Sequence, residues 1–188
     1  MDKKAIRKKI IAERDDLDFG VKQSKDEIII NRFLDQGFIE KYDNIFCYVS
    51  FGSEIDNGKI LSTILDSGKN LFVPYVDIDS RQMCLCQIHD IAEDLERGHY
   101  GILEPKKILR KPVNSGIIDC VISPGVAFTR KMERIGYGGG YYDRFYSSLK
   151  KMPFIVALAY DFQIVDSLPT ESFDIPVDMI ITETQIIK

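Results

Sequence analysis

The sequence is poor in the residues that bind transition metals or form disulfides. It has no tryptophan, two histidines and four cysteines in 188 residues. The cysteines (Cys47, Cys84, Cys86 and Cys120) contain no pair with the two-residue gap of a zinc knuckle or a dithiol redox motif. We therefore expect four buried thiols in a reducing compartment.

Long apolar segments are also missing. The start of the chain, MDKKAIRKKII, is charged and has no long apolar core behind it, so it does not predict a secretory signal. The longest apolar runs, such as FIVALAY, are much shorter than the roughly 20 residues that a membrane helix needs. The sequence predicts a cytoplasmic protein that does not contact a membrane.

The chain has no excess of positive charge. Its formal net charge is -4, which argues against a general nucleic-acid binder, although a local basic cluster is enough to hold a small anion. Hydrophobic residues make up 45% and charged residues 29%, as in ordinary globular proteins. We expect one domain over residues 1–188.

Short apolar, β-rich runs alternate with amphipathic segments. Strands are predicted at residues 44–50, 70–76, 117–123, 154–160 and 177–182, and MCLCQI predicts an added hairpin strand. Helices are predicted at residues 3–17, 21–34, 58–67 and 141–151. This alternation indicates an α/β fold, a Rossmann-like three-layer sandwich with a mostly parallel sheet.

Ligands of such sheets bind at the carboxyl ends of the strands. The loops after Ser50, Val76, Ser123 and Tyr160 are therefore the expected place of a site. No G-x-S-x-G motif and no Cys/His pairing of known spacing occurs, so nothing supports hydrolysis by a nucleophilic side chain.

Four of the 13 glycines lie in one stretch, RIGYGGGYYDRF, residues 134–145. A glycine-rich loop that opens a helix directs free N–H groups at one place, near the positive end of the helix dipole. The loop is not a dinucleotide motif, because Tyr141 stands where G-x-G-x-x-G needs glycine, and no Lys-Ser or Lys-Thr follows as in a P-loop. Spacing alone leaves two alternatives, a phosphate cradle or a surface turn.

Charged neighbours favour the phosphate cradle. Arginine and lysine side chains surround the loop (Arg130, Lys131, Arg134 and Arg144), and guanidinium groups suit phosphate oxygens. Asp143 lies in the first turn of the predicted helix, where an acid complements the dipole by default; the other interpretation is a magnesium ligand.

Other charged residues are individually weaker candidates. Lys3, Arg7 and Arg14 fall near one face of the first predicted helix, which is either a solvated face or, if the helix docks near the loop, a phosphate contact. Glu54 follows the first strand, and Asp174 and Asp178 precede the last one, where caps and turns are the default roles. Together these features favour a phosphate- or nucleotide-binding enzyme that uses magnesium.

The stretch RIGYGGGYYDRF closely resembles the signature of the 5-formyltetrahydrofolate cyclo-ligase family, also called methenyltetrahydrofolate synthetases. The K-x-x-x-R opening, YVSFGSEID, FVPYV, GILEP and FDIPVDMIIT also resemble family motifs, in order, across almost the whole chain. The resemblance implies an α/β sandwich similar to the sugar-phosphate isomerases. Gly139 stands where some relatives have lysine.

The resemblance implies conversion of 5-formyltetrahydrofolate to 5,10-methenyltetrahydrofolate, with ATP as co-substrate, Mg²⁺ as cofactor, and release of ADP and phosphate through a phosphorylated formyl intermediate. These two small molecules would be its partners. We expect a monomer that binds neither nucleic acid nor membrane.

The resemblance also implies the site residues. Catalysis is assigned to Arg134, Tyr141 and Asp143, and metal binding to Asp143 and Asp174, with Asp178 as the alternative to Asp174. ATP binding is assigned to Lys3, Lys4, Arg7, Arg134, Ile135, Gly136, Tyr137, Gly138, Gly139, Gly140, Tyr141 and Tyr142. Folate binding is assigned to Val49, Phe51, Glu54, Tyr137, Gly138, Gly139, Gly140 and Tyr141.

Two other classes stay open. A sugar-phosphate isomerase on a similar fold would have no use for Lys3, Arg7 and Glu54 together. A non-catalytic relative that only binds nucleotide or folate would be expected to lack the metal acids or basic residues, and this sequence has both.

Overall fold

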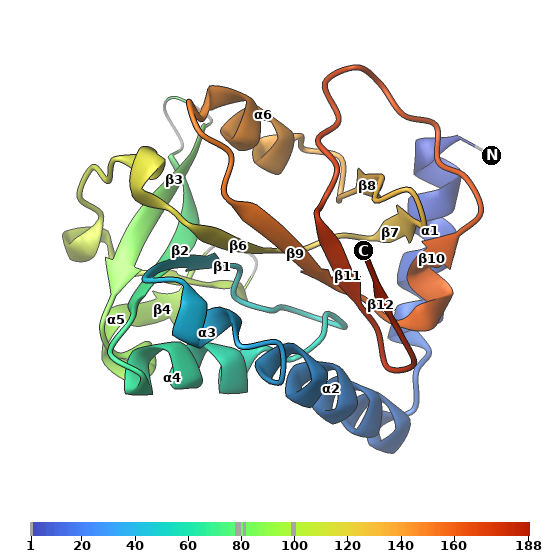
Figure 1. The fold of residues 1–188 in the computed structure, drawn as a ribbon, viewed down its shortest axis with the longest axis horizontal. Coiled ribbons are helices and arrows are strands. Elements are labelled where there is room, and N and C mark those ends of the chain that lie inside the picture. The colour runs from blue at the N-terminus through green and yellow to red at the C-terminus, as the bar shows by residue number, and fades with distance from the viewer. Residues whose placement is uncertain (1, 78–79, 81, 99–100) are drawn as a thin grey trace.

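The computed structural model describes residues 2–77, 80, 82–98 and 101–188, and shows a sheet between two layers of helices (Figure 1). Seven strands form this sheet in the order β12-β11-β9-β6-β1-β2-β3. Their bounds are β1 (Asn44–Cys47), β2 (Asn70–Asp77), β3 (Gln82–Ile88), β6 (Cys120–Ser123), β9 (Phe154–Leu158), β11 (Met179–Ile181) and β12 (Ile186–Ile187).

The sheet is mostly parallel, as predicted. The five inner strands, from β11 to β2, pair in parallel and correspond to the five strands expected from the sequence. The two edge strands pair antiparallel, β3 with β2 and β12 with β11. The predicted MCLCQI hairpin strand is therefore confirmed as β3, whereas β12 was not predicted because two residues carry no periodic signal.

Helices cover both faces of the sheet. Figure 1 shows α2 (Phe19–Leu34), α3 (Phe38–Lys41) and α4 (Gly58–Asp66) on one face and α6 (Tyr141–Ser148) on the other. Gly68 ends α4, because its positive φ of 70° is a left-handed conformation that glycine adopts without strain. This arrangement confirms the three-layer α/β prediction; the likeness to sugar-phosphate isomerases stays a prediction.

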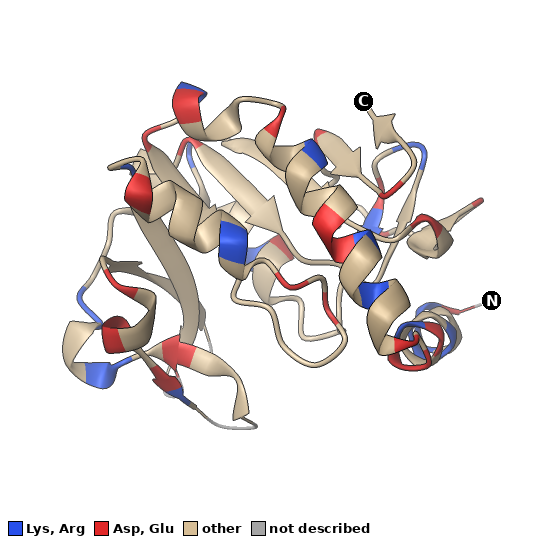
Figure 2. Cartoon of the chain, turned by 90° about the horizontal axis from the view of Figure 1, so that it is seen from below, with Lys and Arg blue, Asp and Glu red and all other residues tan. Residues whose placement is uncertain are grey.

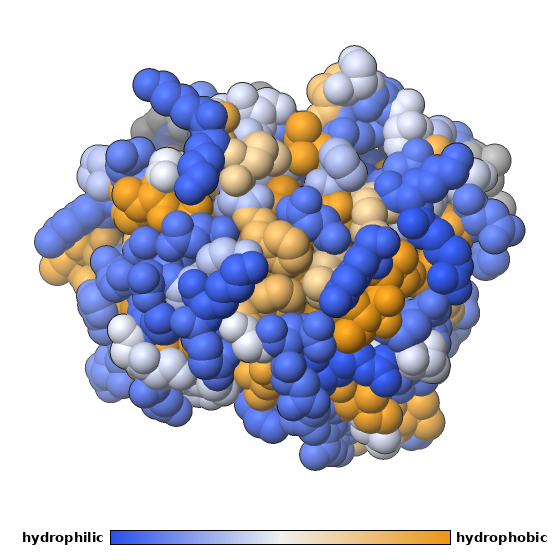
Figure 3. All heavy atoms as spheres, in the orientation of Figure 1, coloured by the Kyte–Doolittle hydropathy of each residue, from blue (hydrophilic) through white to orange (hydrophobic). Residues whose placement is uncertain are grey.

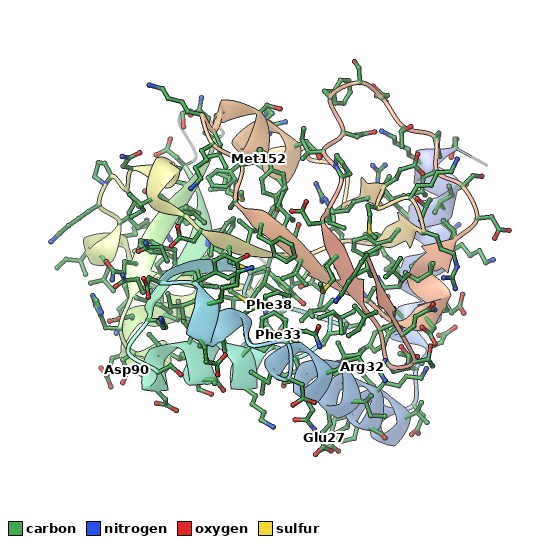
Figure 4. The ribbon with its side chains drawn as sticks, viewed as in Figure 1. Glu27, Arg32, Phe33, Phe38, Asp90 and Met152 are labelled. Atoms are coloured by element: carbon green, nitrogen blue, oxygen red, sulfur yellow. The ribbon has the colours of Figure 1, made fainter. Side chains whose placement is uncertain are left out.

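Alternating side chains on the strands fill two separate cores. In β1, Ile45 and Cys47 pack toward α2 and α4, whereas Phe46 packs toward Phe145 of α6. On the first of these faces Phe33 and Phe38 lie side by side, with ring centroids 5.5 Å apart (Figure 4). The strands of the seven-stranded sheet are almost free of charged residues, which lie mainly on helices, loops and the short strands outside it (Figure 2).

The first helix, α1 (Lys3–Asp15), lies beside the sheet rather than on either face (Figure 1). Its Ile6 and Ile10 pack on a small sheet of three short strands, β7 (Ala127–Thr129), β8 (Arg134–Ile135) and β10 (Ile164–Val165). Asp2 caps the helix by accepting from the N–H of Ala5 at 2.7 Å. Because β8 leads straight into the glycine loop, this packing brings α1 to that loop.

Smaller elements complete the chain. They are β4 (Leu95–Arg97) paired with β5 (Leu103–Pro105), α5 (Ile91–Asp94), and the single-turn helices η2 (Lys107–Leu109), η3 (Ser115–Ile117) and η4 (Asp161–Gln163). The face of the molecule seen in Figure 3 is mostly hydrophilic, with apolar patches between hydrophilic residues. Within the described ranges, no helix is both long and apolar enough to cross a bilayer.

Candidate functional site

A cleft of about 1000 Å³ lies at the carboxyl ends of the parallel strands. Its walls include residues that follow β1, the end of β2 with the start of β3, Pro124 after β6, the glycine loop, α6 and the N-terminal part of α1. Two of the four loops expected from the sequence, those after Ser50 and Ser123, thus contribute. Of the loop after Val76, residues 78, 79 and 81 lie outside the described residues, and the flanking strand residues Val76 and Gln82 line the cleft. The prediction for the loop directly after Tyr160 is wrong: that segment forms η4 and packs under α1, and the chain returns to the cleft only at Glu171, Phe173 and Asp174.

The glycine loop, residues 136–140, forms the centre of the cleft wall. Gly138 and Gly140 have positive φ angles of 106° and 64°, and Gly140 is the residue that precedes α6. A side chain at Gly139 would come within 2.8 Å of the Tyr141 ring. The φ angles of Gly138 and Gly140 favour glycine, because another residue would be strained there, whereas at Gly139 a larger side chain requires the Tyr141 ring to move. The short strand β8 directly precedes the loop, which the sequence did not predict.

Helix α1 supplies two basic side chains to this wall. Arg7 donates from Nε to the carbonyl oxygen of Gly136 at 2.6 Å. Lys3 Nζ lies 2.7 Å from Asp174 Oδ2 and 3.3 Å from Glu171 Oε1. Burial lowers the pKa of Lys3, but these two acids outweigh it and the pKa is raised overall. Lys4, by contrast, is exposed and does not line the cleft.

Arg134 and Asp143 form an ion pair at the start of α6. Arg134 Nη2 lies 2.8 Å from Asp143 Oδ1, and the two side chains are 2% and 19% exposed. The same Asp143 oxygen accepts from the N–H of Ile175 at 3.3 Å. Arg134 Nε is the one buried side-chain nitrogen or oxygen without a hydrogen-bond partner in the part of the chain that the structure describes. A buried donor without a partner is costly, so it indicates a place for an anion.

The predicted metal residues lie close together. Because Ile175 donates to Asp143, its neighbour Asp174 is brought to the same part of the cleft, and both acids line it. The alternative, Asp178, is outside the cleft and accepts from the N–H of Ile155 at 2.7 Å, at the opposite ends of the strands. No cluster of three or more His, Cys, Asp or Glu suited to a metal occurs among the described residues. A cation here would need ligands from a bound phosphate.

A second group of residues surrounds Glu54, which is 5% exposed. Its carboxylate accepts from the N–H of Phe51 at 3.1 Å and from the hydroxyl of Tyr137 at 2.9 Å. Burial raises the pKa of Glu54, and the two hydrogen bonds and the charge of Arg14 act against this. Val49 is half-buried, and it lines the cleft together with the partly exposed rings of Phe51 and Tyr137.

Arg14 stands behind this group. It is 4% exposed, donates from Nη2 to the Tyr137 hydroxyl at 2.5 Å and from Nε to Ser53 Oγ at 2.9 Å, and is not part of the cleft wall. The sequence placed Arg14 on one helix face with Lys3 and Arg7 but assigned it no site role. Its partners are 39 and 123 positions away, so no local pattern could have found them.

The remaining predicted residues of the signature differ in burial. Tyr141 is half-buried, with the Arg144 guanidinium 4.9 Å from its ring centroid, and it lines the cleft. Tyr142 stacks on Phe46 at 5.7 Å, and burial holds its pKa well above the usual range. Ile135 is buried in β8 and contributes to the wall.

We distinguish two ends of the cleft by their charges. The Glu54 end comprises Val49, Phe51, Glu54 and Tyr137; the Asp174 end comprises Lys3, Arg134, Asp143 and Asp174. Helix α1 reaches both, since Lys3 contacts Asp174 and Arg14 contacts Tyr137. Lys3 and Arg14 are eleven positions apart in the helix, which is roughly 16 Å along its axis.

Sequence reasoning missed several cleft residues. They are Tyr48, Pro74, Tyr75, Met83, Leu103, Glu104, Pro124, Ser147, Ser148, Glu171 and Phe173, among others. Phe173 is 58% exposed and lies 5.9 Å from Lys3 Nζ. The available signal was the position of this phenylalanine next to Asp174, because both acids of the segment FDIPVD were already candidates for metal binding.

Comparison with known proteins agrees with the signature. A family profile described as the 5-formyltetrahydrofolate cyclo-ligase family matches residues 1–183. The 5-formyltetrahydrofolate cyclo-ligase of Haemophilus influenzae is 33% identical over 134 residues, which are 71% of this chain and 72% of that protein.

Solved structures agree as well. The NMR structure of Aquifex aeolicus 5,10-methenyltetrahydrofolate synthetase superposes with a TM-score of 0.85 at 31% identity, over 99% of this chain and 92% of that one. The 5,10-methenyltetrahydrofolate synthetase of Mycoplasma pneumoniae, with a TM-score of 0.79 at 24% identity over 97% and 99% of the two chains, shares the fold. With the signature loop at the centre of its cleft and a profile match over residues 1–183, this chain belongs to the 5-formyltetrahydrofolate cyclo-ligase family.

Proposed function

We propose that the protein converts 5-formyltetrahydrofolate to 5,10-methenyltetrahydrofolate in an ATP- and magnesium-dependent reaction that releases ADP and phosphate. The observation that carries this proposal is the Asp174 end of the cleft. There the buried Arg134 Nε lacks a partner next to a glycine loop that opens an eight-residue helix, which is the arrangement expected of a phosphate site.

The Asp174 end would bind the phosphates of ATP. Arg134 and the backbone N–H groups of residues 136–140 supply donors, and Lys3 and Arg7 add positive charge from α1. Phosphate oxygens would compete with Asp174 for Lys3, since that lysine is 2.7 Å from the carboxylate. Lys4 is exposed, so any part it plays would be through long-range attraction.

Asp143 and Asp174 are the side chains proposed to hold magnesium. Two carboxylates are a suitable donor set, because Mg²⁺ is commonly held by one or two carboxylates together with substrate phosphates and water. When bound, magnesium offsets the charge of the phosphates during transfer. Asp143 would keep its bond to Arg134 through one oxygen, which leaves the other oxygen for the cation.

The Glu54 end would bind the pterin ring. A carboxylate acceptor suits a ring that presents paired N–H donors, and Glu54 is nearly excluded from water, which strengthens such bonds. Val49, Phe51 and Tyr137 provide apolar surface for the ring. Tyr141, the first residue of α6 after the glycine loop, would orient the formyl group toward the γ-phosphate.

The chemistry follows from the poor leaving ability of a formyl oxygen. This oxygen attacks the γ-phosphate and ADP leaves, which gives a phosphorylated formyl group. The nitrogen at position ten then attacks the formyl carbon, loses its proton, and phosphate leaves as the ring closes. The residues named above act by holding the two substrates in line and by neutralising charge on the phosphoryl oxygens.

We further propose that the protein acts as a cytoplasmic monomer of one domain on these small molecules. The net charge of -4 supports the absence of a nucleic-acid partner. Size-exclusion chromatography coupled to light scattering, run at two protein concentrations, would test the monomer against the mass of 21.5 kDa.

An absorbance assay tests the function. The protein is mixed with ATP, Mg²⁺ and 5-formyltetrahydrofolate, and the methenyl product is followed in the near ultraviolet. We expect product only when all three are present, and no product at saturating substrates would overturn the proposal. Arg7→Met should raise the KM for ATP, whereas Lys8→Met on the exposed side of α1 is the matched control and should not.

A further inference from the structure

A chain of hydrogen bonds joins α1 to the Glu54 end of the cleft. Arg14 Nη2 donates to the oxygen of the Tyr137 hydroxyl at 2.5 Å, and this hydroxyl donates to Glu54 Oε1 at 2.9 Å. A guanidinium group can only donate. The Tyr137 proton therefore points to Glu54, and Glu54 has to accept with that oxygen.

The second Glu54 oxygen also faces a group that can only donate a hydrogen bond. Glu54 Oε2 accepts from the N–H of Phe51 at 3.1 Å, and a backbone N–H can only donate. Both oxygens thus face fixed donors, which favours the ionised carboxylate. Arg14 is itself oriented by Ser53, which accepts from Nε at 2.9 Å and donates to Asp15.

We propose that Arg14 is a positioning residue for the folate substrate: through Tyr137 it keeps Glu54 ionised and oriented to accept N–H groups of the pterin. This inference rests on the proposed function. Arg14 lies outside the cleft wall, so it acts without touching the substrate.

The other charged and titratable groups near Glu54 do not replace Arg14. Lys22 of α2 also favours the ionised carboxylate, but its Nζ lies 2.6 Å from Asp26, which balances its charge. Tyr48 after β1 and Tyr142 of α6 are neutral, since burial raises the pKa of both hydroxyls well above the usual range. Arg14 forms no ion pair with another described residue, so its charge is directed at Tyr137 and Glu54.

A packing role for Arg14 would predict different results. If the side chain only fixed α1 in place, its loss would affect both ends of the cleft, because Lys3 and Arg7 are on the same helix. If it acts through Tyr137, the loss would be confined to folate and would depend on pH. The sign follows from the charges: without Arg14 the pKa of Glu54 rises further, so folate affinity is lost at a higher pH as the solution is acidified.

The test compares Arg14→Met, Arg14→Lys and wild type. We expect Arg14→Met to raise the KM for 5-formyltetrahydrofolate about tenfold at pH 7, which is about 1.4 kcal/mol, with the KM for ATP unchanged. The acid limb of kcat/KM for folate should move to higher pH. Arg14→Lys should restore the acid limb because it keeps the charge. Arg32→Met is the matched control: it removes another partly buried arginine, whose bond at 2.7 Å goes to the carbonyl of Thr182, outside the cleft.

A second variant keeps the test valid if Arg14→Met folds poorly. Tyr137→Phe removes the linking hydroxyl and retains the ring, and Arg14→Lys in that background should then change folate KM by less than it does in wild type. Additive effects, or equal increases in the KM of both substrates, would overturn the inference.

Calorimetric binding of 5-formyltetrahydrofolate to the same proteins separates the two proposals. If wild type forms no methenyl product, the proposed function fails, and weaker, more acid-sensitive folate binding by Arg14→Met would still support the inference. If wild type turns over and Arg14→Met matches it in folate affinity from pH 5 to 8, the inference fails alone. No folate binding to wild type by either method overturns both.

Discussion

The two ends of the cleft hold their charges in different ways. At the Asp174 end, Lys3 is paired with Asp174 and Arg134 with Asp143, each at 2.7 to 2.8 Å. At the Glu54 end, a nearly buried carboxylate accepts from a backbone N–H and a tyrosine hydroxyl. The first end must exchange partners when a charged ligand enters, whereas the second already presents oriented oxygens. Substitutions should therefore cost stability at the Asp174 end and only binding at the Glu54 end.

Asp143→Asn should have the largest effect. It leaves the Arg134 guanidinium, whose side chain is 2% exposed, without its carboxylate. Removing one partner of a buried ion pair should cost about 3 kcal/mol of unfolding free energy, which urea denaturation would measure. Magnesium-dependent turnover should fall as well. Glu133→Gln is the control, since Glu133 is half-buried and its carboxylate accepts from the neutral Thr129 hydroxyl; equal stability of both variants would contradict the expectation.

Glu54→Gln should come next and should spare stability. Glutamine has one acceptor oxygen where glutamate has two, so it cannot accept as many N–H groups. The KM for 5-formyltetrahydrofolate should therefore rise about a hundredfold, or about 2.7 kcal/mol, with little change in the KM for ATP.

The pH dependence of the unfolding free energy gives a second test of how Glu54 is held. Burial raises the pKa of Glu54, so folding favours its neutral form and the charged form is a cost at pH 7. The wild type should therefore gain stability relative to Glu54→Gln as the pH falls from 7 toward the ordinary glutamate value. A loss of stability in Glu54→Gln at pH 7 comparable to that of Asp143→Asn would abolish the distinction between the two ends.

Gly138→Ala should affect both ends together, because the glycine loop lies between them. At φ 106° a side chain is strained by about 1–3 kcal/mol, and the loop would shift to relieve it. We expect similar increases in KM for ATP and folate, each about tenfold. Gly68→Ala is the control: its φ is 70° but it ends α4 outside the cleft, so it should lower stability and leave both KM values alone.

Asp174→Asn should have the smallest effect. An amide oxygen can still contact a cation, so the magnesium concentration at half-maximal rate should rise about fivefold, close to 1 kcal/mol. Glu171→Gln is the control, because Glu171 also pairs with Lys3, at 3.3 Å, but is not a proposed metal ligand. Equal magnesium dependence in the two variants would mean that Asp174 serves only to hold Lys3.

The sequence predicted the parts of the fold that have a periodic pattern. The five parallel strands and the helix after the glycine loop were found because their apolar spacing is local. The strand predicted at 117–123 begins only at Cys120, because residues 115–117 form η3. Strands β7, β8 and β10 have two or three residues each, too few for any period, so the sequence could not predict the surface on which α1 docks.

The signature named many of the residues that line the candidate cleft, but it did not predict which of them form hydrogen bonds or ion pairs with one another. The signature gave the glycine loop, Arg134 and Asp143, but not their ion pair, which depends on how the loop folds back. Arg14 was visible as a charge on a helix face, yet its role requires the docking of α1 against a loop 123 positions away. Such contacts follow from tertiary structure and leave no trace in local spacing.

The bond between Lys3 and Asp174 joins residues 171 positions apart in the sequence. During synthesis the first helix is made long before its partner, and at 5–20 residues per second the interval is on the order of 10 s or more. Until then Lys3 has no acid from the closing segment to pair with, and the cleft lacks the part of its wall that Glu171, Phe173 and Asp174 supply. The order of synthesis thus makes the Asp174 end the last part of the site to assemble, after the partners that hold the rest of α1, on β7, β8 and the glycine loop, have been made.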